Sequence, residues 1–155
     1  MAQGTILGVV SSRGDYPRPT IVHWSLPGIA AASQSTELIE IDIPGMASDE
    51  VSPTLAGDAN VIQLVSFNAD STSTDFDISI LTKNDIDALD TMYEVFKYTG
   101  ANLSVVDSDL GNLLIGNHDS EIDSRKNKLY VFIKNDDAVN GTGDIRLELG
   151  LLIFD

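Results

Sequence analysis

The chain has 155 residues, a length typical of one domain, and 43% of them are hydrophobic, which is enough for a core. Its net charge is −15, and the stretch 19–82 has nine acidic and no basic residues, so we expect neither nucleic acid nor an anionic membrane as a partner. The absence of Cys excludes disulfides, thiolate metal sites and cysteine nucleophiles.

The first third of the chain predicts extended structure. Residues 5–10 (TILGVV) are predicted to be the first strand, and residues 20–24 form a further apolar run between prolines. Because proline lacks an amide donor, we expect the second run to be an edge strand or irregular. Residues 37–43 place three isoleucines on one face and acidic residues on the other, which predicts a half-buried strand. Residues 46–60 are predicted to be a long connection.

The rest of the chain predicts further strands. Asn84 to Thr91 interrupts them as one helical turn, capped by Asn84 or Asp85. Eight of the ten aromatic residues lie at or after Phe67, so we expect an N-terminal arm or edge-strand region over 1–35 and a sandwich domain over 36–155. The fold class is therefore all-β, an antiparallel β-sandwich with an extended N-terminal arm. The expected strands are 61–67, 75–80, 93–98, 102–106, 113–115, 128–134 and 144–149.

The sequence offers no convincing catalytic set. A nucleophile, a base and an orienting carboxylate could be assigned to Ser120, His118 and Asp119. Adjacent residues on a turn point away from one another, however, so these three cannot form the required relay. Two histidines are also too few for a His-rich metal site. We therefore expect no enzyme activity and no catalytic residues.

Calcium is the one cofactor that the acidic loops suggest, because hard oxygen ligands suit Ca²⁺. Carboxylates alternate at Asp75/Asp77 and at 119–123, and the loops to watch hold Asp107, Asp109, Asp136 and Asp137. No stretch has the twelve-residue EF-hand spacing. The alternative is that these Asp and Asn side chains stabilise turns by bonding nearby backbone, and no cofactor is then expected.

Trp24 is the only tryptophan, and it lies in the proline-flanked segment. A large amphipathic ring there suits an interface anchor, and an arm could add a strand to the exposed sheet edge of a neighbouring subunit. The alternative for Trp24 is core packing. The residues expected to form an assembly interface are Ile6, Leu7, Val9, Tyr16, Ile21 and Trp24.

Three segments carry a resemblance to known proteins: 73–80 (STDFDISI), 93–103 (YEVFKYTGANL) and 128–136 (KLYVFIKND). Their spacing resembles small jelly-roll domains in structural proteins of tailed phages, used as capsid decoration (cement) or tail-associated modules. It is also similar to secreted β-sandwiches of the pre-peptidase C-terminal type. The likeness covers about residues 60–155, and the chain lacks the signal peptide that secreted modules usually carry.

The phage resemblance implies a jelly-roll protein without catalytic activity that decorates and stabilises a capsid through symmetric subunit contacts. Its partners would be the major capsid protein and two further copies in a homotrimer. It would be made in the host cytoplasm, since the first 11 residues do not form a signal peptide, and would end on the outer capsid surface of the virion. The alternative function is a carbohydrate- or host-receptor-binding β-sandwich, in which Tyr93, Tyr98 and Tyr130 could present aromatic platforms.

Overall fold

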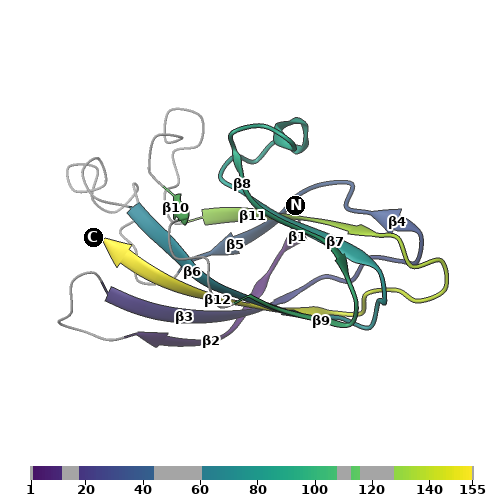
Figure 1. The fold of residues 1–155 in the computed structure, drawn as a ribbon, viewed down its shortest axis with the longest axis horizontal. Helices are drawn as coiled ribbons and strands as arrows, with labels where there is room; N and C mark the ends of the chain where they lie inside the picture. The colour runs from purple at the N-terminus through teal and green to yellow at the C-terminus, as the bar shows by residue number, and fades with distance from the viewer. Residues whose placement is uncertain (1, 12–17, 44–60, 108–112, 116–127, 155) are drawn as a thin grey trace.

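The computed structural model of the chain describes residues 2–11, 18–43, 61–107, 113–115 and 128–154. In these ranges the chain forms two six-stranded sheets that lie face to face, as Figure 1 shows. All strand pairs but one are antiparallel, and a single short 3₁₀ helix is present among the described residues. The predicted antiparallel β-sandwich is confirmed, while the jelly-roll subtype stays a prediction.

Each sheet draws its strands from both ends of the chain. Sheet A has the order β1 (Ala2–Gln3), β5 (Ile39–Asp42), β11 (Lys128–Asn135), β7 (Phe76–Leu81), β8 (Glu94–Ala101), and β4 (Ser33–Gln34) also pairs with β11. Sheet B has the order β10 (Leu113–Ile115), β6 (Val61–Asp70), β12 (Ile145–Phe154), β3 (Arg18–Leu26), β2 (Thr5–Ser11), and β9 (Ser104–Asp107) also pairs with β6. Strand β1 is parallel to β5.

The main core lies between the two sheets and follows from the alternation of apolar residues along each strand. In β12, Leu147, Leu149 and Leu151 face inward and are buried. From the opposite sheet, β11 contributes Leu129, Val131 and Ile133. The ring of Phe67 meets that of Phe96 across the sandwich, with centroids 4.6 Å apart.

A second, smaller core covers the outer face of sheet A. Tyr130 and Phe132 of β11 are buried there together with Leu38, Leu81 and Ala88. The segment that covers them contains the 3₁₀ helix η1 (Ile86–Ala88), which is capped by Asp85 as the sequence predicts. Strand β11 is therefore buried on both faces, although its alternating pattern predicts only one buried face. The difference arises because a loop distant in sequence folds over the strand.

The described N-terminal residues form strands of both sheets and include the edge strand β2, which fits the predicted edge-strand region rather than a separate arm; the division at residue 35 stays a prediction. Strand β1 pairs with β5 in sheet A, and β2 pairs with β3 in sheet B, so the chain crosses between the sheets near Gly4. A Cβ at Gly4 would lie 2.8 Å from Ile41 Cγ2 and 2.9 Å from Leu26 Cδ2, one residue from each sheet. The described part of the region is built into the sandwich because an apolar run gains backbone pairing and burial there.

The proline-flanked run at residues 20–24 also differs from its prediction, since β3 is an interior strand between β2 and β12. Its prolines interfere little because Pro19 lies near the start of the strand and Pro27 follows its last residue. The edge of sheet B is β2 instead.

A buried ion pair joins two strands of sheet A. Lys128 Nζ lies 2.5 Å from Glu40 Oε1 and also contacts Asp42, and the side chains of Lys128 and Glu40 are 11% and 6% exposed. Burial by itself lowers the pKa of Lys128, but its hydrogen bonds to Asp42 and Glu40 outweigh burial and raise the pKa above its ordinary value. Lys128 therefore stays charged and ties β11 to β5.

Candidate functional site

Four of the six predicted assembly residues lie exposed at one edge of the sandwich. Ile6, Leu7 and Val9 are on the edge strand β2, and Ile21 is on its neighbour β3, with exposed fractions between 41% and 56%. Val10, which the sequence analysis omitted, is 67% exposed beside Ile21 in the strand register. We call these five residues the β2–β3 strip.

The strip occupies both faces of β2. Ile6 lies opposite Trp24 and Val9 opposite Val22, so these two side chains border the core, whereas Val10 lies opposite Ile21 on the outer face. The register slips between Ile6 and Gly8, which makes Leu7 the extra residue of a β-bulge. Strand β2 itself carries no charged side chain on either face.

Charge separates β2 from the other described edge strands of at least four residues. Strand β8 carries Glu94 and Lys97, and β9 carries Asp107, whereas residues 2–11 contain no Asp, Glu, Lys or Arg. Natural edge strands usually carry charges that prevent pairing with another chain. An uncharged, aliphatic edge strand such as β2 is thus typical of a strand that another segment or chain covers.

Trp24 is a core residue, which favours the alternative of packing over that of an interface anchor. Its exposed fraction is 0%, and its indole N–H donates a hydrogen bond to the Asp42 carbonyl at 3.0 Å. The ring lies in sheet B and its partner lies in sheet A, so the residue joins the two layers. Tyr16, the sixth predicted assembly residue, lies outside the described residues.

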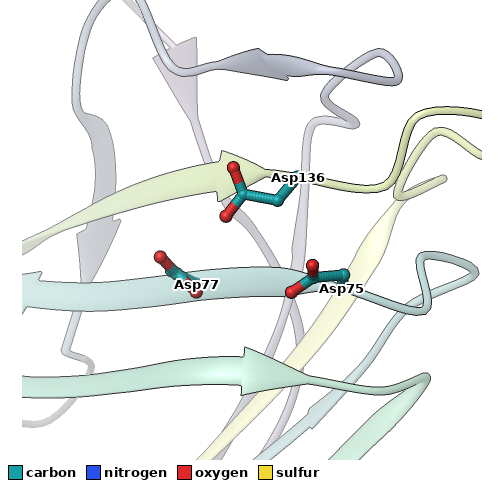
Figure 2. A group of neighbouring side chains, drawn as sticks. All are labelled: Asp75, Asp77 and Asp136. Atoms are coloured by element: carbon teal, nitrogen blue, oxygen red, sulfur yellow. The ribbon is translucent and has the colours of Figure 1, made fainter.

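A group of three carboxylates gathers on sheet A, as Figure 2 shows. Asp75 and Asp77 are at the start of β7, Asp136 follows β11, and their oxygens lie within 4.8 Å of one another. Register accounts for the meeting, because Asn135 pairs with Phe76, and the Asp136 N–H donates to the Asp75 carbonyl at 2.9 Å. Oxygen ligands at this spacing match the preference of hard cations.

Protein groups already contact two of these carboxylates. Lys134 Nζ lies 3.5 Å from Asp136 Oδ1, and the Gly100 N–H donates to Asp77 Oδ1 at 2.9 Å. Both contacts offset part of the repulsion between the carboxylates.

Asp137 does not join this group, although the sequence analysis paired it with Asp136 as a metal ligand. Its carboxylate accepts hydrogen bonds from the backbone N–H groups of Thr74, Val139 and Asn140 and from the side chains of Thr74 and Asn140. These donors, the Asn140 N–H foremost, hold the pKa of Asp137 far below its ordinary value of 3.8. Its structural role is to stabilise the turn after β11.

The remaining predicted metal ligands lie apart from this group. Asp107 is at the end of β9 in sheet B, and Asp109 lies outside the described residues. Sequence reasoning named the Asp75/Asp77 and Asp136/Asp137 pairs separately, but only the pairing of β7 with β11 brings Asp136 to Asp75 and Asp77.

Two adjoining depressions mark the outer face of sheet A. One has a volume of about 340 Å³, and the other, of about 230 Å³, includes Asp77, Ser79 and Lys97 in its lining. Gln34 and Lys134 line both depressions. Both depressions are open, and their polar side chains offer donors and acceptors to a hydroxyl-rich ligand, while the smaller one is also lined by Leu89 and Phe132.

The three tyrosines considered as sugar platforms do not line these depressions. Tyr130 is buried in the second core, and Tyr98 is 37% exposed on the edge strand β8. Tyr93 is half-buried, with Lys83 Nζ 5.1 Å from its ring centroid. The aromatic residue in the described lining is Phe132, which lines the smaller depression and is otherwise buried in the second core.

The histidine in the described part of the chain is His23, whose Nε2 lies 3.3 Å from Glu148 Oε2 across neighbouring strands. His118, Asp119 and Ser120 lie outside the described residues. Among the described residues, no helix is long and apolar enough to cross a membrane.

Comparison with known proteins assigns the chain to no family. No protein-family model matches the chain, and no curated protein sequence matches it. The resemblance to phage structural domains therefore stays a prediction.

Proposed function

We propose that this protein is a structural accessory protein without catalytic activity, which decorates the outside of a phage capsid and stabilises it through symmetric contacts between subunits. The observation that supports the proposal best is the β2–β3 strip, an uncharged aliphatic surface on a chain of net charge −15. An edge strand without charges offers a place where another chain can pair.

The strip is large enough to matter energetically. The exposed fractions of its five residues add up to about two and a half whole aliphatic residues, whose burial is worth about 4–7 kcal/mol per copy at 1.5–3 kcal/mol each. One such contact is weak once the cost of association is subtracted. Many copies on a symmetric lattice would together raise the temperature at which a shell comes apart.

The described sandwich is suited to a mechanical role. The carboxylate of Asp137 and the side chain of Asn135 hold turns in place, and Lys128 links two strands. A rigid scaffold whose polar groups bond one another can transmit force between neighbouring subunits. The major capsid protein as partner comes from the resemblance and is part of the same proposal.

Immunogold electron microscopy tests the proposal. An antibody raised against the purified protein is applied to particles released from the cells that produce it. We expect gold on the outer surface of intact shells, and particles stripped of the protein should open at a lower temperature. Unlabelled particles, in a sample whose lysate contains the protein, would refute a decoration role.

A matched pair of variants tests the surface. Val10→Lys places a charge on the strip, and Val106→Lys places one on β9 at a residue of similar exposure, 72%. Only Val10→Lys should abolish labelling of the particles, because only this variant charges the strip. Equal labelling by both variants would exclude the strip from attachment.

The second candidate is a carbohydrate-binding module, which the adjoining polar depressions on sheet A support. A glycan array probed with the purified protein tests this function. Binding that is lost in Gln34→Ala and Lys134→Ala but kept in Lys83→Ala, whose lysine lies outside the depressions, would favour it. An array without signal would leave the depressions without this role.

A further inference from the structure

The sequence of β2 is that of an interior strand placed at an edge. Strands buried on both faces have continuous apolar runs, whereas solvent-facing strands alternate with polar residues. Strand β2 has Ile6, Leu7, Val9 and Val10 around a single Gly8, and all four aliphatic side chains are exposed. In the described residues its hydrogen-bonded neighbour is β3, and its opposite edge is open.

We propose that β2 pairs in antiparallel fashion with β2 of a second copy of this chain about a two-fold axis. The pairing joins sheet B of one copy to sheet B of the other. This inference rests on the proposed function, because it names the partner that covers the same strip, and it predicts a two-fold contact where the phage resemblance implies a trimer.

A second copy suits the edge because a two-fold contact is self-complementary. Both strands present open backbone donors and acceptors, and each strip is covered by an equally uncharged, aliphatic strip. The backbone groups along this edge thus gain partners in the same step that removes the aliphatic side chains from water.

Charge also favours a partner of this kind. Two copies that each carry −15 repel one another, and the repulsion is smallest when they meet through a surface without charge, such as residues 2–11, which have no charged side chains. A basic partner would be drawn to the acidic surfaces elsewhere on the chain rather than to this edge. The contact should therefore strengthen when salt screens the repulsion, whereas binding of a basic partner would weaken.

The size of the strip sets the expected strength. At on the order of 100 Å² of apolar surface per aliphatic side chain, the strip offers about 250 Å² per copy, or about 500 Å² for two. Stable interfaces bury at least about 1,200 Å² in total, of which somewhat more than half is apolar. Backbone pairing and polar neighbours supply part of the remainder, so we expect a dimer that dissociates on dilution.

Sedimentation velocity of the full chain over a range of concentrations is the first test. We expect a monomer–dimer equilibrium that shifts toward dimer when salt rises from about 0.05 M to about 0.5 M. Val10→Lys should weaken the dimer at least tenfold, and Val106→Lys should leave it within twofold, with circular dichroism confirming that both variants fold. A monomer at every concentration, or equal dimerisation of the two variants, would overturn the inference.

Single cysteines provide a second test, since the chain has no Cys to interfere. A strand paired with its own copy about a two-fold axis places one residue opposite itself, at a Cα separation that a disulfide can bridge. Under oxidation, at least one of Gly8→Cys, Val9→Cys and Val10→Cys should form a covalent dimer rapidly, and Val106→Cys should not. Gly8 tolerates the change because a Cβ there meets no atom within 4 Å. Equal cross-linking at all four positions would contradict the pairing.

The outcomes separate this inference from the proposed function. Particles labelled by the antibody together with a monomer that fails to cross-link would refute the pairing and keep the decoration role. A dimer that cross-links at β2, together with unlabelled particles, would keep the pairing and refute the decoration role.

Discussion

Replacing Trp24 tests whether this residue holds the two sheets together or serves as a surface anchor. Its side chain is fully buried, and truncation of a buried Trp typically costs 3–5 kcal/mol, so we expect Trp24→Ala to lower the free energy of unfolding by about 4 kcal/mol. Trp24→Phe keeps an aromatic ring but removes the donor to the Asp42 carbonyl, which predicts a loss of about 1–2 kcal/mol.

Urea unfolding followed by far-ultraviolet circular dichroism measures both variants on the same scale as the wild type. Intrinsic fluorescence adds an independent readout, because Trp24 is the only tryptophan in the chain. Folded protein should emit at short wavelength and resist quenching by iodide, and both properties should be lost on unfolding. An iodide-accessible indole together with a Trp24→Ala variant of wild-type stability would refute the core assignment.

Three further changes probe the scaffold. Gly150→Ala should lower the free energy of unfolding by about 1–3 kcal/mol, because its Cβ would overlap the Ser66 hydroxyl. Adding Ser66→Ala should restore most of this free energy, as measured by urea unfolding. Lys128→Met should lower the free energy of unfolding by about 3 kcal/mol, because it leaves Glu40 buried without its cation. A double variant that also carries Glu40→Gln should be more stable than the single one. An unchanged thermal midpoint for Lys128→Met would contradict this. Asp137→Asn should lower the thermal midpoint at neutral pH. Because the folded-state pKa of Asp137 lies below its ordinary 3.8, its stabilisation is complete above that pH and is lost as pH falls toward the folded pKa, so the difference from wild type should shrink below pH 3.8. A difference independent of pH would show that the charge of Asp137 contributes nothing.

Local sequence was sufficient for the elements themselves. The alternating runs at 75–80, 128–134 and 144–149 became β7, β11 and the first half of β12, because a period of two places every second side chain on the same face of a strand. The helical turn capped by Asp85 was also predictable, since capping depends on a side chain and the backbone two residues away. The assembly residues Ile6, Leu7, Val9 and Ile21 can be named from sequence because they are aliphatic residues near the N-terminus, but their exposure at a sheet edge depends on the fold.

Tertiary structure decided which segments meet. The sequence allows two roles for Trp24, an interface anchor or a core residue. Its place in the core follows from the position of β3 inside sheet B, where the indole donates a hydrogen bond to sheet A. Asp136 and Asp137 are neighbours in the chain, yet one carboxylate meets Asp75 and Asp77 and the other caps a turn. Strand alternation could not show this separation, because it depends on the register between β7 and β11.

The sequence by itself therefore determined that the protein is a β-sandwich, where most of its strands lie, and that its charge is strongly acidic. Only the tertiary structure showed that the N-terminal strands belong to both sheets, that β11 is covered on both faces, and that β2 is an uncharged open edge. Periodicity and capping depend on residues close together in the sequence, so they can be read from it. Whether a strand lies at an edge depends on whether a segment distant in sequence pairs with it, and this is known only from the fold.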